Sequence, residues 1–281
     1  MKRGLLAMAL GVFATGALGA PINNTLFLHH FDGPVGSGAD TADYANGDPA
    51  EQVPTPFGHG GQIVTSPSKF GGGSLLRTNG VDIGGRVEYS AAGNYNPNLG
   101  TVEMWINSAS LTTSTSFDGL WGTVTGSGNT DVRMYIYSVG GVRTLGAYQL
   151  NGGGAFWEEE QAIPAALLTD NEWHHVAWAF DTANGKAATW WDGHLLRNTP
   201  DAGTIASRTT FNNTLFHIGE NQNGSGTFPG YIDEFRISDK MQYDTTQSFI
   251  APTGPFAVPE PASLGLLATA GLLLARRRRS L

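Results

Sequence analysis

Short segments in which apolar and polar residues alternate dominate this chain, and they constrain its fold more than any other feature. In 99–107 (LGTVEMWIN), Val102 and Met104 point to one face, and Glu103 and Trp105 point to the other. A period of two predicts a half-buried β-strand. Glycine makes up 39 of the 281 residues, about twice its usual share, and it supplies the tight turns that short strands need.

Glycine-containing turns between such segments predict two hairpins. They join these expected strands: 132–139 with 143–150, and 173–181 with 186–191. The second turn ends in Asn184-Gly185, a pair that favours tight hairpins. Further strands are expected at 25–31, 214–219 and 230–238, and a helix of at most two turns at 162–168. Strands with so little helix predict an all-β, antiparallel β-sandwich or barrel of roughly 12–14 strands in one domain.

The N-terminus has the pattern of a secretory signal peptide. Lys2 and Arg3 precede an apolar run over 5–18, and small residues close that run. A charged start, an apolar core and a small-residue exit are the features that a signal peptidase recognises. We therefore expect residues 1–20 to be removed and the protein to be secreted across the inner membrane.

The C-terminus has three parts. Residues 241–257 show no periodicity and are expected to form a linker, and 258–281 contain Val258-Pro-Glu-Pro, an apolar stretch over 264–275 and four arginines. The stretch is shorter than the ~20 residues of a full transmembrane helix, and the arginines favour a cytoplasmic end. These features predict transient membrane insertion, with a permanent anchor as the alternative.

This tail resembles the PEP-CTERM sorting signal of Gram-negative bacteria. The resemblance is carried by Pro259, Glu260, Pro261, Arg276, Arg277, Arg278 and Arg279. It implies processing by an exosortase-type membrane protease and a location at the cell surface or outside the cell.

Charge and cysteine content exclude several classes of function. Residues 21–258 carry 10 basic and 23 acidic side chains, a net charge of −13. Such an acidic chain disfavours binding to nucleic acid or to anionic lipid. The sequence has no cysteine, so disulfides, thiolate metal sites and a cysteine nucleophile are excluded.

Four stretches together resemble the laminin-G-like, concanavalin A-like jelly-roll domains of bacterial surface proteins. They are 26–33 (LFLHHFDG), 69–76 (KFGGGSLL), 171–193 (NEWHHVAWAFDTANGKAATWWDG) and 230–238 (GYIDEFRIS). The resemblance implies a jelly-roll β-sandwich that fills residues 21–240.

Catalysis by paired carboxylates is not expected from the spacing of acidic residues. A retaining glycosidase needs two carboxyl groups about 5–5.5 Å apart, and segment 99–107 offers Glu103 alone. The run 158–160 (EEE) is consecutive, so its side chains are expected to splay as a solvated charge run. Asp233 and Glu234 point to opposite faces, and no G-x-S-x-G elbow is present. The chain is predicted not to be an enzyme, with a glycoside hydrolase or polysaccharide lyase as the alternative.

Metal binding is expected only as a structural calcium ion. The pairs His29-His30 and His174-His175 place adjacent side chains on opposite faces of a strand, so neither pair is expected to hold one metal. The jelly-roll resemblance implies calcium ligands at Asp32, Asp233 and the Gly33 carbonyl. The alternative is that Asp32 forms an Asp-Gly turn and Asp233 binds nearby backbone.

Sugar binding would use exposed aromatic rings, and three tryptophans are candidates. Trp121 and Trp157 lie in glycine-rich surroundings. Trp190 and Trp191 face opposite sides of one strand, so at most one is expected in the core, and Trp191 is the third candidate. Three others are assigned to the core: Trp105, Trp173 and Trp178.

The sequence therefore predicts a non-catalytic surface or matrix recognition module. The jelly-roll resemblance implies a polysaccharide of the cell's own exopolysaccharide layer as the expected ligand, and surface proteins are possible partners. A purely structural surface protein is the third hypothesis, because a fold alone does not define a function.

Overall fold

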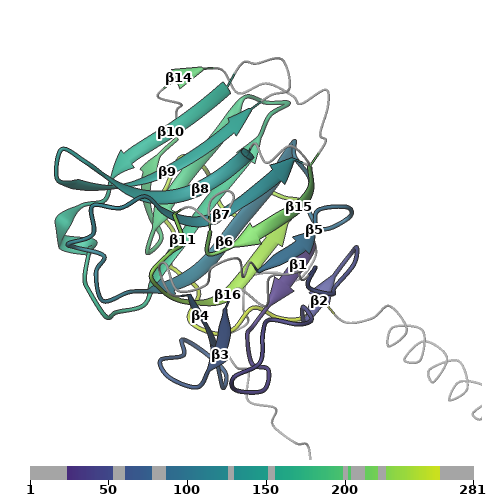
Figure 1. Ribbon diagram of the computed structural model, residues 1–281. Helices are drawn as coiled ribbons and strands as arrows, with labels where there is room; N and C mark the ends of the chain where they lie inside the picture. Colours follow the sequence, from purple (N-terminus) through teal and green to yellow (C-terminus); the bar gives the residue numbers. More distant parts are fainter. Residues whose placement is uncertain are drawn as a thin grey trace, which may run out of the picture.

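The computed structural model shows two β-sheets packed face to face (Figure 1). It describes residues 24–52, 61–77, 87–125, 130–150, 156–198, 202–203, 213–220 and 226–259. All ladders between the strands of these ranges are antiparallel, as the sequence predicts.

The first sheet has nine strands in the described residues. Its main path has the order β13-β12-β11-β6-β16-β1-β2, and β4 pairs with β16 and β3. In chain order the bounds are β1 (Thr25–His29), β2 (Tyr44–Ala45), β3 (Gln62–Val64), β4 (Ser74–Arg77), β6 (Leu99–Asn107), β11 (His174–Asp181), β12 (Lys186–Trp191), β13 (His194–Arg197) and β16 (Gly230–Ser238).

The second sheet has seven strands in the described residues, in the order β14-β10-β9-β8-β7-β15-β5, and it lies in front in Figure 1. In chain order the bounds are β5 (Glu88–Ser90), β7 (Asp118–Thr125), β8 (Thr130–Val139), β9 (Val142–Leu150), β10 (Phe156–Ala162), β14 (Ala202–Gly203) and β15 (Asn213–Ile218).

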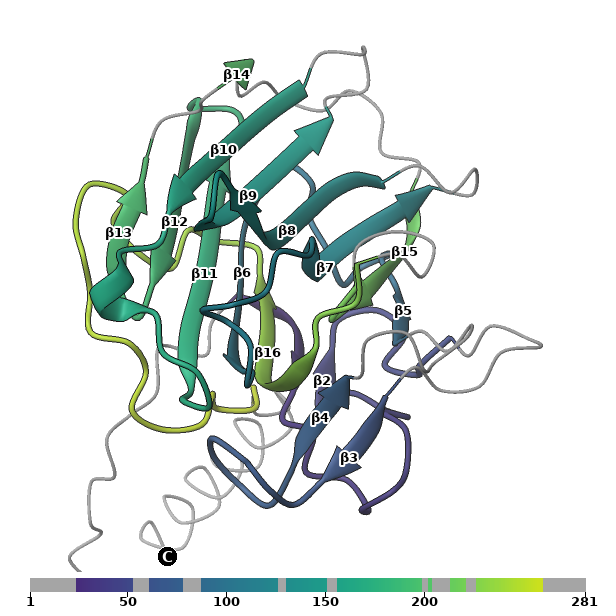
Figure 2. The same ribbon diagram turned by 60° about the vertical axis from the view of Figure 1, so that its left-hand side comes forward.

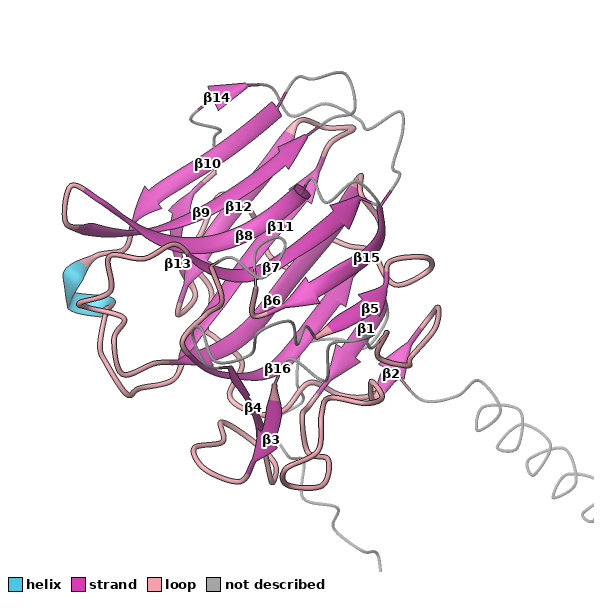
Figure 3. Ribbon diagram, viewed as in Figure 1, coloured by secondary structure: helices cyan, strands magenta, loops and turns pink. Residues whose placement is uncertain are grey.

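Most strands form where the alternation predicts them. β6 and β16 coincide with the expected strands 99–107 and 230–238, and both expected hairpins are present as β8–β9 and β11–β12. The helix expected at 162–168 is a single 3₁₀ turn at Ala165–Leu167, shown in cyan in Figure 3. Its three residues are not buried, so no apolar face supports a longer helix.

The main core lies between the two sheets and is rich in aromatic rings. Trp121 and Trp178 meet at a ring-centroid distance of 6.3 Å, and Phe27 contacts Phe216 at 5.1 Å. All four side chains are fully buried. Burying a large apolar side chain stabilises a fold by about 1.5–3 kcal/mol, so these rings hold the sheets together without disulfides.

Two of the tryptophan assignments to this core are wrong. Trp105 is 5% exposed, but its ring faces away from the second sheet. On that outer side the ammonium group of Lys69 lies 3.8 Å from the centroid of the ring. Trp173 precedes β11 and is only half-buried. Trp178 alone of the three lies between the sheets.

Residues 241–257, hereafter the C-terminal strap, pack against the outer face of the nine-stranded sheet. Figure 2 shows this yellow-green segment running past β13 and β12. Tyr243 and Phe249 stack on each other at 3.6 Å, and both contact the ring of Trp190. Alanines on β11 and β12 leave room for these rings: Ala177, Ala179 and Ala188. The strap has no strand, but it is part of the folded domain.

The expected signal peptide 1–20, the sorting motif from Glu260 onward and the apolar stretch 264–275 lie outside the described residues. Among the residues that are described, no helix is long and apolar enough to cross a membrane.

Candidate functional site

Outward-facing side chains of β8 and β10 meet on the open surface of the seven-stranded sheet. Because strand residues alternate between faces, Val132 and Met134 enter the core while Arg133 and Tyr135 face outward. We call the resulting cluster the tyrosine–carboxylate face. It consists of Phe117, Arg133, Tyr135, Tyr137, Tyr148, Glu158 and Glu160.

A glycine between two strands allows Tyr135 to reach the carboxylates. Gly146 of β9 lies opposite both Tyr135 and Glu160 in the sheet. A Cβ atom at Gly146 would lie 2.3 Å from the Tyr135 ring, well inside van der Waals contact. The absence of a side chain at this position therefore lets the tyrosine lie across β9 toward β10.

Glu158 and Glu160 share one hydroxyl group. The Tyr135 hydroxyl lies 2.9 Å from Glu158 Oε1 and 2.8 Å from Glu160 Oε1. The Tyr137 hydroxyl also donates to Glu160. Burial raises the pKa of Glu158, the Tyr135 hydrogen bond opposes this, and the neighbouring Glu160 raises it further. Burial and both carboxylates raise the pKa of Tyr135, so its hydroxyl stays protonated.

A cation and several rings surround this carboxylate pair. The Arg133 guanidinium carbon lies 4.6 Å from the centroid of Tyr148 and 5.2 Å from that of Tyr135. Phe117 stacks on Tyr135 at 4.5 Å. Tyr135 is 1% exposed, whereas the other six members are half-buried. The face therefore offers flat apolar surface together with hydrogen-bonding groups.

The expectation for the run 158–160 is wrong in two respects. Glu159 is fully buried, and the Thr189 hydroxyl donates a hydrogen bond to its carboxylate at 3.2 Å. Glu158 and Glu160 do not splay, because residues two apart on a strand share a face. The signal was present in the sequence as Glu-x-Glu and as Arg-x-Tyr-x-Tyr at 133–137.

The tryptophan candidates do not form a ligand site in the described residues. Trp121 is fully buried in β7, and Trp191 is fully buried, with its ring nitrogen donating to the Leu167 carbonyl at 2.9 Å. A ring enclosed in the core cannot stack on a sugar, so both of these predictions are wrong. Trp157 lies in β10, but its side chain is outside the described residues.

The expected calcium ligands bind backbone instead. Asp32 Oδ1 accepts N–H groups of Gly72 and Gly73 at 2.6 and 2.8 Å. Asp233 Oδ2 accepts those of Lys69 and Phe70 at 2.7 and 3.2 Å. Both carboxylates therefore hold the loop that contains the glycine run.

This arrangement does not fit a cation at Asp233, because N–H donors point at both of its oxygens, and at Asp32 they occupy Oδ1. Within the described ranges no group of three or more histidine, aspartate or glutamate side chains is placed to hold a metal. Burial also raises the pKa of Asp233 to about 7, although the N–H donors oppose that shift. The expectation of calcium thus rests on the resemblance alone.

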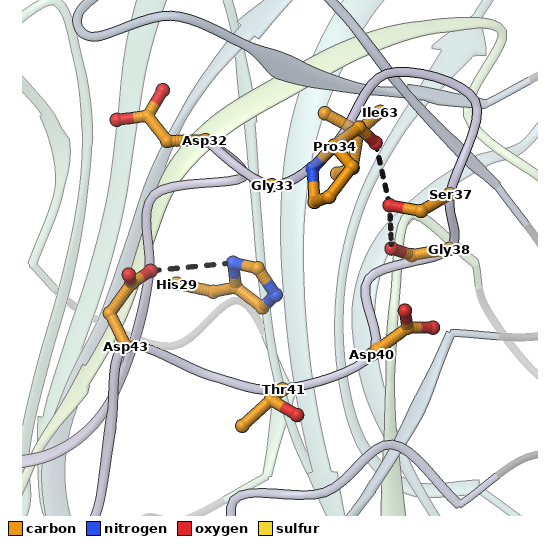
Figure 4. Close-up of a pocket in the computed structure, with 10 residues that line it drawn as sticks. All are labelled: His29, Asp32, Gly33, Pro34, Ser37, Gly38, Asp40, Thr41, Asp43 and Ile63. Carbon is orange, nitrogen blue, oxygen red and sulfur yellow. Dashed lines mark hydrogen bonds and ion pairs between the residues drawn. The ribbon is translucent and has the colours of Figure 1, made fainter.

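A pocket of about 340 Å³ lies beside Gly33, at the end of β1 (Figure 4). His29 lies within it, accepts the Phe31 N–H at 2.9 Å and lies 3.6 Å from the Asp43 carboxylate. Burial lowers the pKa of His29 to about 4, so this ring is neutral at pH 7. Asp43 accepts the His30 N–H at 2.7 Å. These interactions fix the loop around the pocket.

The sheet order and the packing of the two sheets define a concanavalin A-like β-sandwich of the jelly-roll type. The chain belongs to the concanavalin A-like lectin/glucanases superfamily, whose laminin-G-like family model matches residues 81–242, more than half of the chain. The predicted fold class is confirmed. None of the curated proteins compared with the chain matches it.

Solved structures share this fold at low sequence identity. The binding domain of botulinum neurotoxin DC in complex with rat synaptotagmin II has a TM-score of 0.55 at 14% identity, over 80% of this chain and 50% of that chain. A structure of botulinum neurotoxin type C, whose cell entry depends on interaction with two ganglioside molecules, has a TM-score of 0.55 at 12% identity, over 80% of this chain and 49% of that chain. The CBM40 domain of the Ruminococcus gnavus IT-sialidase has a TM-score of 0.46 at 15% identity, over 62% of this chain and 92% of that chain. The chain spans about half the length of the toxin structures.

Proposed function

We propose that the protein is an exported, non-catalytic recognition module that binds polysaccharide on the tyrosine–carboxylate face. One observation carries the proposal: partly exposed aromatic rings surround a carboxylate pair on the open surface of a sheet. Aromatic rings bury large flat areas, and sugar rings present apolar faces that match them. Carboxylates accept hydrogen bonds from hydroxyl groups. A few placed polar groups within apolar surface are the usual composition of a ligand site.

Export is proposed from the sequence of the two chain ends. The leader 1–20 would direct secretion, and the tail 258–281 would insert transiently into the membrane for an exosortase-type protease. The location would then be the cell surface or the extracellular matrix. The intact mass of the protein recovered from each cell fraction tests this, because retention of residues 264–281 in the inner membrane would identify a permanent anchor instead.

Removing an aromatic ring from the face is expected to weaken polysaccharide binding. Tyr137→Ala and Tyr148→Ala should each lower affinity about tenfold, because a stacked ring contributes roughly 0.5–1.5 kcal/mol beyond its buried area. Co-sedimentation of the full chain with insoluble polysaccharides, including the exopolysaccharide of its host, measures this. Tyr44→Ala is the matched control, since Tyr44 is half-buried on β2 of the other sheet. Equal loss in all three variants would contradict the assignment of the face.

A glycoside hydrolase is the second candidate, and the pairing of Glu158 with Glu160 favours it. Both Oε1 atoms contact one hydroxyl, a geometry within reach of the roughly 5–5.5 Å separation used by retaining enzymes. The raised pKa of Glu158 suits a general acid. Release of reducing ends by the wild type, and its loss in Glu160→Gln with binding retained, would replace the non-catalytic proposal with this one.

A further inference from the structure

Arg133 of β8 is the basic member of the tyrosine–carboxylate face, and aromatic rings hold its guanidinium group in place. The guanidinium carbon lies 4.6 Å from the ring centroid of Tyr148, 5.2 Å from that of Tyr135 and 5.5 Å from that of Phe117. Tyr148 is also its cross-strand neighbour in the β8–β9 ladder. A guanidinium group stacks well on aromatic faces, so these contacts give the cation a defined position on the sheet.

The N–H donors of this guanidinium are not used within the protein. A guanidinium group has five N–H donors and no acceptor. Among the residues that the structure describes, Arg133 forms cation–π contacts but no hydrogen bond or ion pair, and its Nε atom is buried without a partner. The Nη1 and Nη2 atoms are not enclosed in this way, so their donors can reach a ligand at the surface.

The neighbouring carboxyl groups do not take these donors. The charge of Arg133 acts to lower the pKa of Glu158, but the groups that hydrogen-bond to Glu158 are Tyr135 and Glu160. A hydrogen bond between two carboxyl groups needs a proton on one of them, so the pair carries less negative charge than two separate carboxylates. The donors of Arg133 therefore remain for a group from outside the chain.

A carboxylate is the group that matches these donors. Its two oxygens accept two parallel N–H bonds from one guanidinium group, and such charge-assisted bonds are stronger than those to neutral hydroxyl groups. An ammonium group has no acceptor to offer. Charges are screened beyond about 8 Å at physiological salt, so the net charge of −13 over residues 21–258 acts only weakly on a carboxylate that contacts Arg133.

We propose, on the basis of the function proposed above, that Arg133 makes the tyrosine–carboxylate face selective for polysaccharides of the uronic acid class. The sugar carboxylate accepts hydrogen bonds from Nη1 and Nη2 of Arg133. The sugar ring packs on the half-buried aromatic side chains beside it, Phe117, Tyr137 and Tyr148.

A matched pair of ligands tests this proposal. We expect the full chain to bind a galacturonic acid hexasaccharide at least about tenfold more tightly than its fully methyl-esterified form, a difference of about 1.4 kcal/mol. Methyl esterification removes the negative charge and keeps the sugar ring. Titration calorimetry at physiological salt measures both affinities.

Variants assign the preference to Arg133. Arg133→Met keeps an unbranched side chain against the rings and removes all the donors, so the affinity for the acid should fall to that for the ester. Arg133→Lys keeps the charge but loses the planar fork, so the ratio of the two affinities should fall to about threefold. Lys186→Met is the matched control for loss of one positive charge, because Lys186 is exposed on β12 of the other sheet, and it should keep the tenfold ratio.

Two results with these variants would overturn the proposal. An unchanged ratio in Arg133→Met would show that another group causes the preference. If Arg133→Met does not fold, an unchanged ratio in Arg133→Lys has the same consequence, because the carboxylate would then not use the planar fork.

The remaining outcomes separate the two proposals. Equal affinity for the acid and the ester, or tighter binding of the ester, overturns the selection of uronic acids and leaves polysaccharide binding in place. Binding of another polysaccharide but of neither hexasaccharide has the same meaning. Absence of binding to any glycan in both this titration and the co-sedimentation assay overturns the proposed function itself.

Discussion

A chain that ends at Lys240 is expected to lose its cooperative fold, whereas a chain that ends at Val258 keeps it. The C-terminal strap places Met241, Tyr243 and Phe249 on the nine-stranded sheet and buries Phe256 to 2% exposure. Each large apolar side chain contributes about 1.5–3 kcal/mol when it is fully buried. Their sum is a large part of the roughly 5–15 kcal/mol that stabilises a domain.

Loss of the polar interactions of the strap would further lower the stability of the shorter chain. The Tyr243 hydroxyl donates to Glu103 at 2.6 Å, and the Phe256 N–H donates to Glu234 at 2.7 Å. Both glutamates are buried, so removal of the strap would take donors from buried carboxylates and expose the ring of Trp190. A buried group that loses its partner costs about 1–3 kcal/mol, and more when it is charged.

Urea unfolding of the two shortened chains measures the difference. Because the shorter chain is expected to aggregate, Phe256→Ala in the full chain gives a second test, with an expected loss of about 3–5 kcal/mol. Ile250→Ala is its control in the same strap, since Ile250 is 89% exposed. Equal stability of the two shortened chains would show that the strap is a linker, as the sequence alone predicts.

The strap could not be foreseen because it contacts the sheet through a few separated anchors. The apolar residues of 241–257 recur neither at the two-residue period of a strand nor at the 3.6-residue period of a helix, and neither element forms there. The strands were predictable for the opposite reason: in 99–107 each residue alternates between the core and the outer face, and this alternation is local in sequence. Periodicity of apolar residues therefore predicts strands, but it does not predict irregular segments that pack on a sheet.

The tyrosine–carboxylate face was missed because it depends on register across three strands. Tyr135, Gly146 and Glu160 become neighbours only through the β8–β9–β10 pairing, and no spacing within one segment encodes that pairing. Trp121 was misplaced for a related reason. The register shifts between Gly119 and Trp121, so Leu120 and Trp121 are both buried in a stretch whose glycines resemble those of a loop.

The second large effect is expected at a buried ion pair on β6 and β16. Arg236 donates to Glu103 Oε1 through Nε at 2.9 Å and Nη2 at 2.6 Å. Glu103 Oε2 also contacts His175 Nε2 at 3.1 Å. Burial acts to raise the pKa of Glu103, but Arg236, His175 and Tyr243 together lower it to about 2. The carboxylate is therefore ionised in the folded protein at neutral pH. Its stabilising effect is complete above the ordinary glutamate pKa of 4.5 and is lost progressively as the pH falls from there to about 2.

Arg236→Met is expected to destabilise the domain by about 3–5 kcal/mol, because it leaves an ionised carboxylate buried without its main partner. Glu103→Gln in the same chain should recover part of this loss, since the amide removes the charge and keeps the contacts to His175 and Tyr243. Lys186→Met is the control, because Lys186 is exposed. Urea unfolding measures all three. If the double variant is less stable than Arg236→Met alone, the loss does not come from the unpaired charge, and the packing of Arg236 over the Phe256 ring at 3.9 Å becomes the reason that this arginine stabilises the fold.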